Sequence, residues 1–267
     1  MNGFDLSTVT NIYLGSTPVK KVYMGTKLIW SKTVDYSSEY FTIESLEDGN
    51  QIGIVDSDRP SISISTDKQT WTTVTPNAAP TYFITLNAGE KVYIKGNNNA
   101  YFDYSWSTEG YFTSTGKFNV SGNIMSLLYE DDFKNKTTLQ SSYTFRSLFK
   151  SNKLISAEHL VLPATTLANN CYYNMFIGCT SLTTAPELPA TTLADGCYYY
   201  MFRDCTKIKM STTKTGEYQT AYRIPKSGTG TTATKALNSM FTGTGGTFKG
   251  TPEINTTYYL STSNTVV

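Results

Sequence analysis

The chain has 267 residues, of which 39% are hydrophobic and 16% charged, with a formal net charge of +1. This length allows two or three domains, or one domain beside an array of repeats. The near-neutral charge provides no long-range field to attract nucleic acid, and no apolar run approaches the roughly 18 residues of a membrane span, so we expect neither nucleic-acid binding nor membrane insertion.

Residues 1–35 are predicted to form a small β-hairpin docking module. The opening MNGFDLSTVTN has neither the basic nor the apolar segment of a secretory signal peptide. The next stretch, NIYLGSTPVKKVYMGTKLIW, repeats one strand pattern after ten residues, and its Gly-containing links suit tight hairpins. Ordering so short a chain costs more free energy than these side chains recover by burial, so we expect the module to need a partner. We assign assembly docking to its apolar residues Tyr13, Leu14, Val22, Tyr23, Met24 and Trp30.

Residues 36–125 are predicted to form an antiparallel β-sandwich. Strand-like segments follow one another at short spacing, among them FTIES, SISIS, YFITL and KVYIKG. The segment STDKQTW at 65–71 is similar to an Asp-box turn but lacks its glycine. We interpret Asp67 as a hairpin-turn residue that binds backbone amides.

Residues 126–267 are predicted to form a short α/β solenoid. The segment LPATTLANNCYYNMFIGCT at 162–180 recurs at 188–206 as LPATTLADGCYYYMFRDCT, with 14 of 19 positions identical. Degenerate copies lie at 137–154 and 231–244, as expected of units that cap a stack.

Each repeat unit is expected to hold a short helix and a short strand. The i, i+4 spacing of apolar residues predicts a helix over 167–177, capped by Thr166. The strands that follow would form a parallel ladder between stacked units. The Thr- and Gly-rich stretch 211–234 is an insertion between units, and insertions of this length are often functional or disordered.

The four cysteines, Cys171, Cys179, Cys197 and Cys205, have the same spacing in both good repeats. Stacking would place Cys171 over Cys197 and Cys179 over Cys205. Three interpretations follow: small buried side chains of the core, disulfides, or a metal site. The long spacing differs from the close pairs of zinc sites, and the core interpretation is favoured.

No catalytic motif is found, and we expect a non-enzymatic protein without cofactor or metal. The acidic run Glu130-Asp131-Asp132 could supply paired carboxylates, but acids adjacent in sequence are more typical of a solvated loop. The single histidine, His159, lies between repeats and is expected at the surface.

Tyrosines are the better candidates for a binding surface. The five tyrosines of the repeats cannot all point inward on a helix, and displayed tyrosines suit glycan or protein contacts; the alternative is that they pack between repeats. These candidates are Tyr172, Tyr173, Tyr198, Tyr199 and Tyr200.

Residues 162–187 and their copy resemble the BspA-type leucine-rich repeat. The first unit matches its pattern at Leu162, Pro163, Phe176, Cys179 and Leu182. The second unit matches at Leu188, Pro189, Phe202, Cys205 and Ile208. That family is associated with bacterial surface adhesins and other attachment proteins, so the resemblance implies an attachment role.

The N-terminal hairpins followed by a β-domain and LPATTL units resemble virion proteins from phages of gut Bacteroidetes. This resemblance implies a tail or head fibre or a decoration protein, assembled in the host cytoplasm and exposed on the particle. Its partners would be other virion proteins at the N-terminus, a host cell-surface glycan or protein, and further copies of itself. The alternative is a bacterial cell-surface adhesin of the same repeat family.

Overall fold

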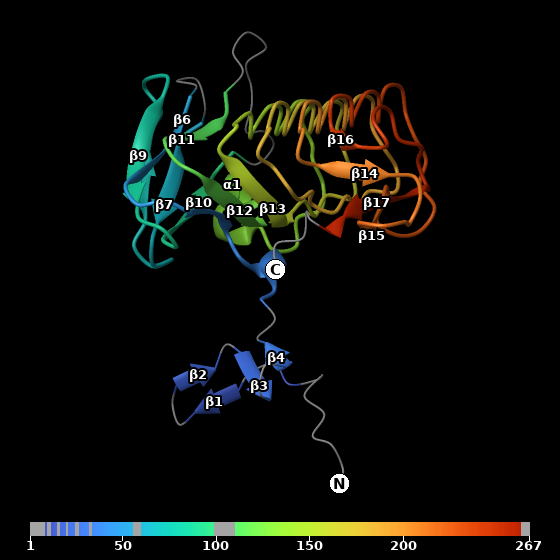
Figure 1. Cartoon of the computed structure of the whole chain (residues 1–267). Coiled ribbons are helices and arrows are strands. Elements are labelled where there is room, and N and C mark those ends of the chain that lie inside the picture. Colours follow the sequence, from blue (N-terminus) through green and yellow to red (C-terminus); the bar gives the residue numbers. More distant parts are fainter. Residues whose placement is uncertain are drawn as a thin grey trace. The chain divides into compact units, whose positions relative to one another are not determined.

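The computed structural model describes residues 9, 12–14, 17–19, 21–24, 27–31, 34–55, 60–98 and 110–262. The chain divides into two compact units, Met1–Asp35 and Tyr36–Val267. The regular secondary structure of the described residues is mainly β-strand, with one α-helix, α1 (Ser126–Tyr129), and two short 3-10 turns, η1 (Tyr36–Ser38) and η2 (Glu130–Asp132) (Figure 1). The prediction of a mainly β protein is confirmed.

The first unit contains two antiparallel hairpins, one from each half of the duplicated pattern. β1 (Ile12–Leu14) pairs with β2 (Thr17–Val19), and β3 (Lys21–Met24) pairs with β4 (Lys27–Ser31). The strands have three to five residues each, so neither hairpin can bury much apolar surface by itself.

The second unit begins with two sheets that share one core. The larger sheet has the order β13-β12-β5-β10-β7-β8 and the smaller β11-β6-β9. Their strands are β5 (Phe41–Ser45), β6 (Asn50–Ile54), β7 (Ile62–Ser65), β8 (Thr72–Val74), β9 (Thr81–Leu86), β10 (Lys91–Gly96), β11 (Phe112–Ser114), β12 (Phe118–Asn123) and β13 (Leu154–Val161). Every pairing is antiparallel except β12 with β13. The rings of Phe41 on β5 and Phe112 on β11 lie 5.2 Å apart, which joins the two sheets.

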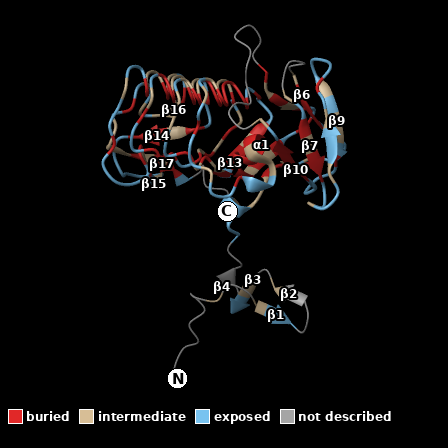
Figure 2. Cartoon of the chain, turned by 180° about the vertical axis from the view of Figure 1, so that it is seen from behind, coloured by how far each residue is buried: buried red, intermediate tan, exposed pale blue. Residues whose placement is uncertain are grey.

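Residues 36–125 and 126–267, expected as two domains, lie in a single compact unit. β13 follows residue 125 yet pairs in parallel with β12, so the larger sheet continues across that boundary. Phe149, in the first repeat copy, packs on Phe41 at 5.7 Å and on Phe112 at 6.3 Å. Buried residues therefore run through the sheets and the repeats alike (Figure 2).

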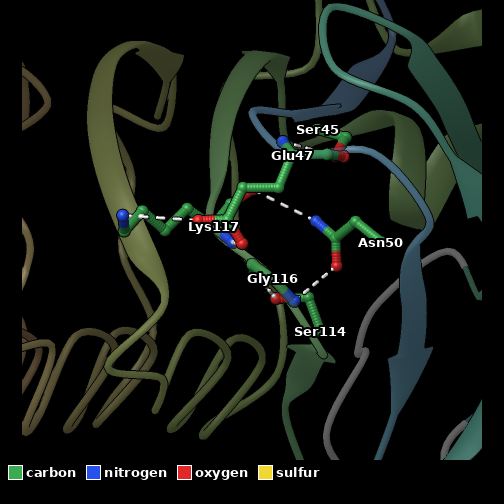
Figure 3. A network of polar contacts seen from close by, with 6 residues as sticks. All are labelled: Ser45, Glu47, Asn50, Ser114, Gly116 and Lys117. Atoms are coloured by element: carbon green, nitrogen blue, oxygen red, sulfur yellow. Dashed lines mark hydrogen bonds and ion pairs between the residues drawn. The ribbon is translucent and has the colours of Figure 1, made fainter.

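The turn between β11 and β12 is fixed by a polar network (Figure 3). The Oδ1 atom of buried Asn50 accepts the Gly116 N–H at 2.7 Å, and its Nδ2 donates to the Lys117 carbonyl at 3.1 Å. Glu47 accepts the Lys117 N–H at 3.1 Å and pairs with its ammonium at 3.3 Å. A Cβ at Gly116 would lie 2.6 Å from the Glu47 carboxylate, so a larger residue there would displace the Glu47 side chain from this network. The network sets where β12, the partner of β13, begins.

The sequence repeats stack on one another, as the row of coils in Figure 1 shows. Parallel bridges connect Thr138, Thr166, Thr192 and Thr231 in turn. The rings of Phe149, Phe176, Phe202 and Phe241 form a column, with centroids 5.3, 5.2 and 5.5 Å apart and interplanar angles of 19°, 6° and 10°. The two degenerate copies thus occupy positions equivalent to those of the regular ones.

The helix predicted over 167–177 is not formed, and consecutive turns take its place. Amides of alternate residues donate to the carbonyl three positions earlier, as from Met175 to Tyr172 at 3.2 Å. The amides between them donate to the next copy, as from Tyr172 to Cys197 at 3.0 Å. An α-helix would use all these amides internally and leave none for the neighbouring copy.

The turns repeat every four residues and need a left-handed backbone at each fourth position. In the second copy these positions are Asn170, Asn174 and Gly178, with φ of 55°, 57° and 70°. Asparagine and glycine are the residues that adopt this conformation at low cost. The spacing of four explains why the apolar pattern resembled a helix of 3.6 residues per turn.

The insertion 211–234 is folded. It contributes β15 (Tyr218–Arg223) to a four-stranded sheet with the order β15-β17-β14-β16, which also contains β14 (Lys209–Ser211), β16 (Gly245–Gly246) and β17 (Thr257–Ser261). The chain after the last copy then closes the stack: Phe241 donates its amide to Gly250 O and Ser239 donates to Thr251 Oγ1, both at 2.8 Å. This segment takes the hydrogen bonds that a further copy would accept.

Candidate binding surfaces

The five candidate tyrosines separate into a buried pair and a surface group. Tyr172 and Tyr198 are each 1% exposed, and their rings stack at 5.8 Å, with Phe145 stacked on Tyr172 at 5.9 Å. The prediction that these two are displayed is wrong, because residues four positions apart share one side of the turns and Tyr172 lies four before buried Phe176. Burial raises the pKa of both phenols well above the usual value.

The other three tyrosines form a half-buried tyrosine cluster with Arg203 at the surface. Tyr173 stacks on Tyr199 at 5.2 Å, and the rings of Tyr199 and Tyr200 lie 3.9 Å apart at 55°. The Arg203 guanidinium lies 4.7 Å from the Tyr200 ring centroid. A hydrogen bond with the Tyr200 hydroxyl, together with partial burial, raises the pKa of Tyr199. The cluster offers flat rings, hydroxyls and a cation to a ligand, a combination suited to glycan or protein contacts.

Four of the six docking residues predicted in the first unit are exposed. Tyr13 and Leu14 are 59% and 80% exposed, and Tyr23 and Met24 are 53% and 67% exposed. Val22 is half-buried, and the Trp30 side chain lies outside the described residues. Each hairpin therefore presents a tyrosine and a large aliphatic side chain on its first strand.

The four cysteines are free and buried, in agreement with the core interpretation. The Cys179 thiol donates to Phe149 O at 2.5 Å and the Cys205 thiol to Phe176 O at 3.0 Å, so each contacts the preceding copy. Burial raises the pKa of Cys179 and of Cys197 to about 12, which keeps these thiols protonated and unreactive at neutral pH. Among the described residues, no group of three or more His, Cys, Asp or Glu could hold a metal ion.

Within the acidic run Glu130-Asp131-Asp132, expected to be a solvated loop, Asp131 makes structural contacts. It accepts the Tyr40 hydroxyl at 2.6 Å and the Lys95 ammonium at 2.9 Å, and both contacts lower its pKa. Lys95 in turn lies 4.3 Å from the centroid of the Trp71 ring. Asp131 thus ties η2 to β10.

The turn role predicted for Asp67 is confirmed. Its Oδ1 atom accepts the amides of Gln69 and Thr70, both at 2.8 Å, and the Ser65 hydroxyl at 2.9 Å. These hydrogen bonds lower the pKa of Asp67 to about 2, and the one from the Thr70 amide has the largest effect.

His159 lies at the surface, in a setting that the sequence did not indicate. Its ring stacks on Tyr36, with centroids 4.4 Å apart and an interplanar angle of 5°. Both residues line a pocket of about 330 Å³. No local pattern could have predicted this pair, because β13 brings His159 to η1 only through its pairing with β12.

Comparison with known proteins gives no relative: no family model, no curated protein and no solved structure matches the chain. Within the described residues, no helix has the length and apolar character needed to cross a membrane.

Proposed function

We propose that this chain is a non-enzymatic structural protein of a bacteriophage virion, a tail or head fibre or a decoration protein. In this proposal residues 1–35 anchor it to other virion proteins, further copies assemble with it, and the repeats face the host. The observation that carries the proposal is the separate unit Met1–Asp35, whose two hairpins expose Tyr13, Leu14, Tyr23 and Met24.

The size of this unit supports a docking role. Chains below about 40 residues seldom bury enough apolar surface to be stable without disulfides, metals or a partner. All four cysteines lie in the repeats, so no disulfide can stabilise the hairpins. Large apolar side chains exposed together commonly mark a surface that another protein covers.

We further propose that the stacked copies form a short solenoid of the BspA leucine-rich-repeat type, used for attachment. The phenylalanine column and the amide ladder between copies support this assignment. Phe41 and Phe112 cover one end of the column, and the segment around Gly250 covers the other. With both ends covered, the exposed sides, including the tyrosine cluster, are left for a host glycan or protein.

The anchoring role is tested by particle assembly. Removing residues 1–32 should leave Tyr36–Val267 folded but absent from purified particles, because the docking side chains are lost while the larger core is intact. A milder variant, Leu14→Ser with Met24→Ser, should reduce incorporation at least tenfold. Incorporation is measured by quantitative mass spectrometry of virions.

The matched control is Tyr82→Ser, which changes a similarly exposed side chain, 42% exposed, in the second unit. This control should incorporate normally. Normal incorporation of the truncated protein would refute the anchoring role of residues 1–35.

A further inference from the structure

The pocket beside His159 lies at the edge of β13, within the unit Tyr36–Val267. Its volume is about 330 Å³, near the lower end of the range for small-molecule sites, about 300–1,000 Å³. The parallel rings of Tyr36 and His159 form one wall, at a centroid separation of 4.4 Å. Stacking restricts both side chains and covers one face of each ring, so the pair offers a ligand the flat outer face of one ring.

The remaining lining combines apolar and ionic groups. Leu160 and Leu162 are buried, and Pro163 and Pro189 are half-buried, so the pocket offers apolar surface without flexible side chains. Pro163 and Pro189 occupy the same position in successive copies. Stacking of the repeats therefore produces this part of the pocket.

Three charged side chains line the same pocket: Glu158, Glu187 and Lys226. Lys226 forms an ion pair with Glu187. Glu158 has no ion pair within the described ranges of the chain, so its carboxylate is available to accept hydrogen bonds. Partial burial and the carboxylates of Glu44, Glu158 and Glu39 raise the pKa of Tyr36, so its hydroxyl remains protonated to a higher pH than that of an ordinary tyrosine.

These groups require a ligand that both donates and accepts hydrogen bonds. Carboxylates only accept and an ammonium only donates, whereas each hydroxyl of a ligand can do both. The carboxylates of Glu158 and Glu187 would repel an anionic ligand, and the ammonium of Lys226 would repel a cationic one. The flat wall and the prolines require that one face of the ligand be C–H groups. A pyranose ring satisfies these requirements together.

We propose that this pocket binds a neutral saccharide of one or two rings. Its C–H face lies against the outer face of the Tyr36–His159 stack, and its hydroxyls donate to Glu158 and Glu187 and accept from Lys226. The inference deepens the proposed function, and rests on it, because it names a glycan as what the repeat region holds and locates the site away from the tyrosine cluster.

The experiment uses His159 as a reporter, because it is the only histidine of the chain. The full-length protein is titrated with galactose, glucose, mannose, N-acetylglucosamine and lactose while the imidazole C–H resonances are followed by NMR. At least one sugar should shift these resonances with a saturable curve. No shift with any of them at the highest soluble concentration would overturn the proposal, as would a saturable shift with only tetramethylammonium or acetate.

Variants then locate the site. Glu158→Gln keeps the shape of the side chain and removes its charge, and should raise the Kd at least tenfold; Tyr36→Ala should abolish saturation. The matched control Glu253→Gln alters an exposed carboxylate outside the pocket and should leave the Kd unchanged.

A Tyr199→Ala variant separates this proposal from the proposed function. Loss of sugar binding in Tyr199→Ala, with Glu158→Gln unaffected, would overturn the pocket assignment while leaving a host-binding surface in place. None of these measurements depends on particle assembly, so a failure here is distinct from a failure of the anchoring role.

Discussion

At the scale of single residues, some polar atoms buried in the stack have a hydrogen-bond partner and others have none among the described residues. The Tyr172 hydroxyl is buried and has no hydrogen-bond partner among the described residues. The Tyr222 hydroxyl is also buried but donates to Pro186 O at 3.1 Å. A buried hydroxyl without a hydrogen-bond partner loses its hydration and gains no hydrogen bond in return. Replacing each of these tyrosines by phenylalanine should therefore change the free energy of unfolding in opposite directions.

Tyr172→Phe should therefore raise the free energy of unfolding by about 1 kcal/mol, because it removes an unsatisfied polar atom from the core. Phe145, stacked on Tyr172 in the adjoining copy, shows that phenylalanine fits this column. The matched variant Tyr222→Phe should lower the free energy of unfolding by about 1 kcal/mol, because the Pro186 carbonyl loses its donor. Urea denaturation measures both, and a loss of stability in Tyr172→Phe would contradict the assignment of its hydroxyl.

At the scale of elements, the distinctive unit is the run of consecutive turns in each copy. Its amides alternate between a local carbonyl and the neighbouring copy, so each run is both a turn and one rung of a ladder. An i, i+4 pattern fits this geometry as well as it fits a helix. The left-handed residues distinguish the two, and asparagine in two such positions of one copy was the signal that the sequence offered.

Two substitutions at one position test this geometry. Asn174 lies in the middle of the predicted helix but has φ of 57°. Asn174→Ala should be less stable than Asn174→Gly by about 1 kcal/mol, because only glycine adopts left-handed backbone without steric cost. In a helix the order would be reversed by about the same amount. Both variants lack the amide side chain, so thermal or urea unfolding compares backbone preferences alone, and a more stable alanine variant would favour the helix.

At the scale of the whole molecule, stability depends on ionisable groups buried in the stack. Burial raises the pKa of Cys179 and Cys197 from 9.0 to about 12, and raises those of Tyr172 and Tyr198 well above 10.0. Above pH 9 the unfolded chain therefore holds fewer protons than the folded one. The contribution of these groups to the free energy of unfolding is fully present below pH 9 and is lost as the pH rises toward about 12.

We therefore expect the free energy of unfolding to be level from neutral pH to about 9 and to fall steadily above it. Cys197→Ala should make this fall shallower, because one buried ionisable group is removed. Ala236 occupies the corresponding place in the last copy, so alanine is compatible with the site. The measurement is urea unfolding across this pH range, and equal slopes in variant and parent would show that the thiol does not contribute.

The sequence by itself determined the elements whose signals are local or repeated. The ten-residue duplication gave both hairpins of the first unit, the 26-residue identity located the copies, and the equal cysteine spacing identified buried positions. A sequence repeat predicts structure well here because equivalent residues in stacked copies have equivalent neighbours.

Only the tertiary structure decided which tyrosines face the core, how the insertion folds and where a pocket forms. Tyr172 and Tyr173 are adjacent and chemically identical, and only the period of the turns places one inside and one at the surface. β15 is ordered by pairing with β17, and the His159 ring stacks on Tyr36 of η1. These contacts join residues far apart in the chain, so no local propensity encodes them; they exist because the hydrogen-bonded ladders and the shared core bring the segments together.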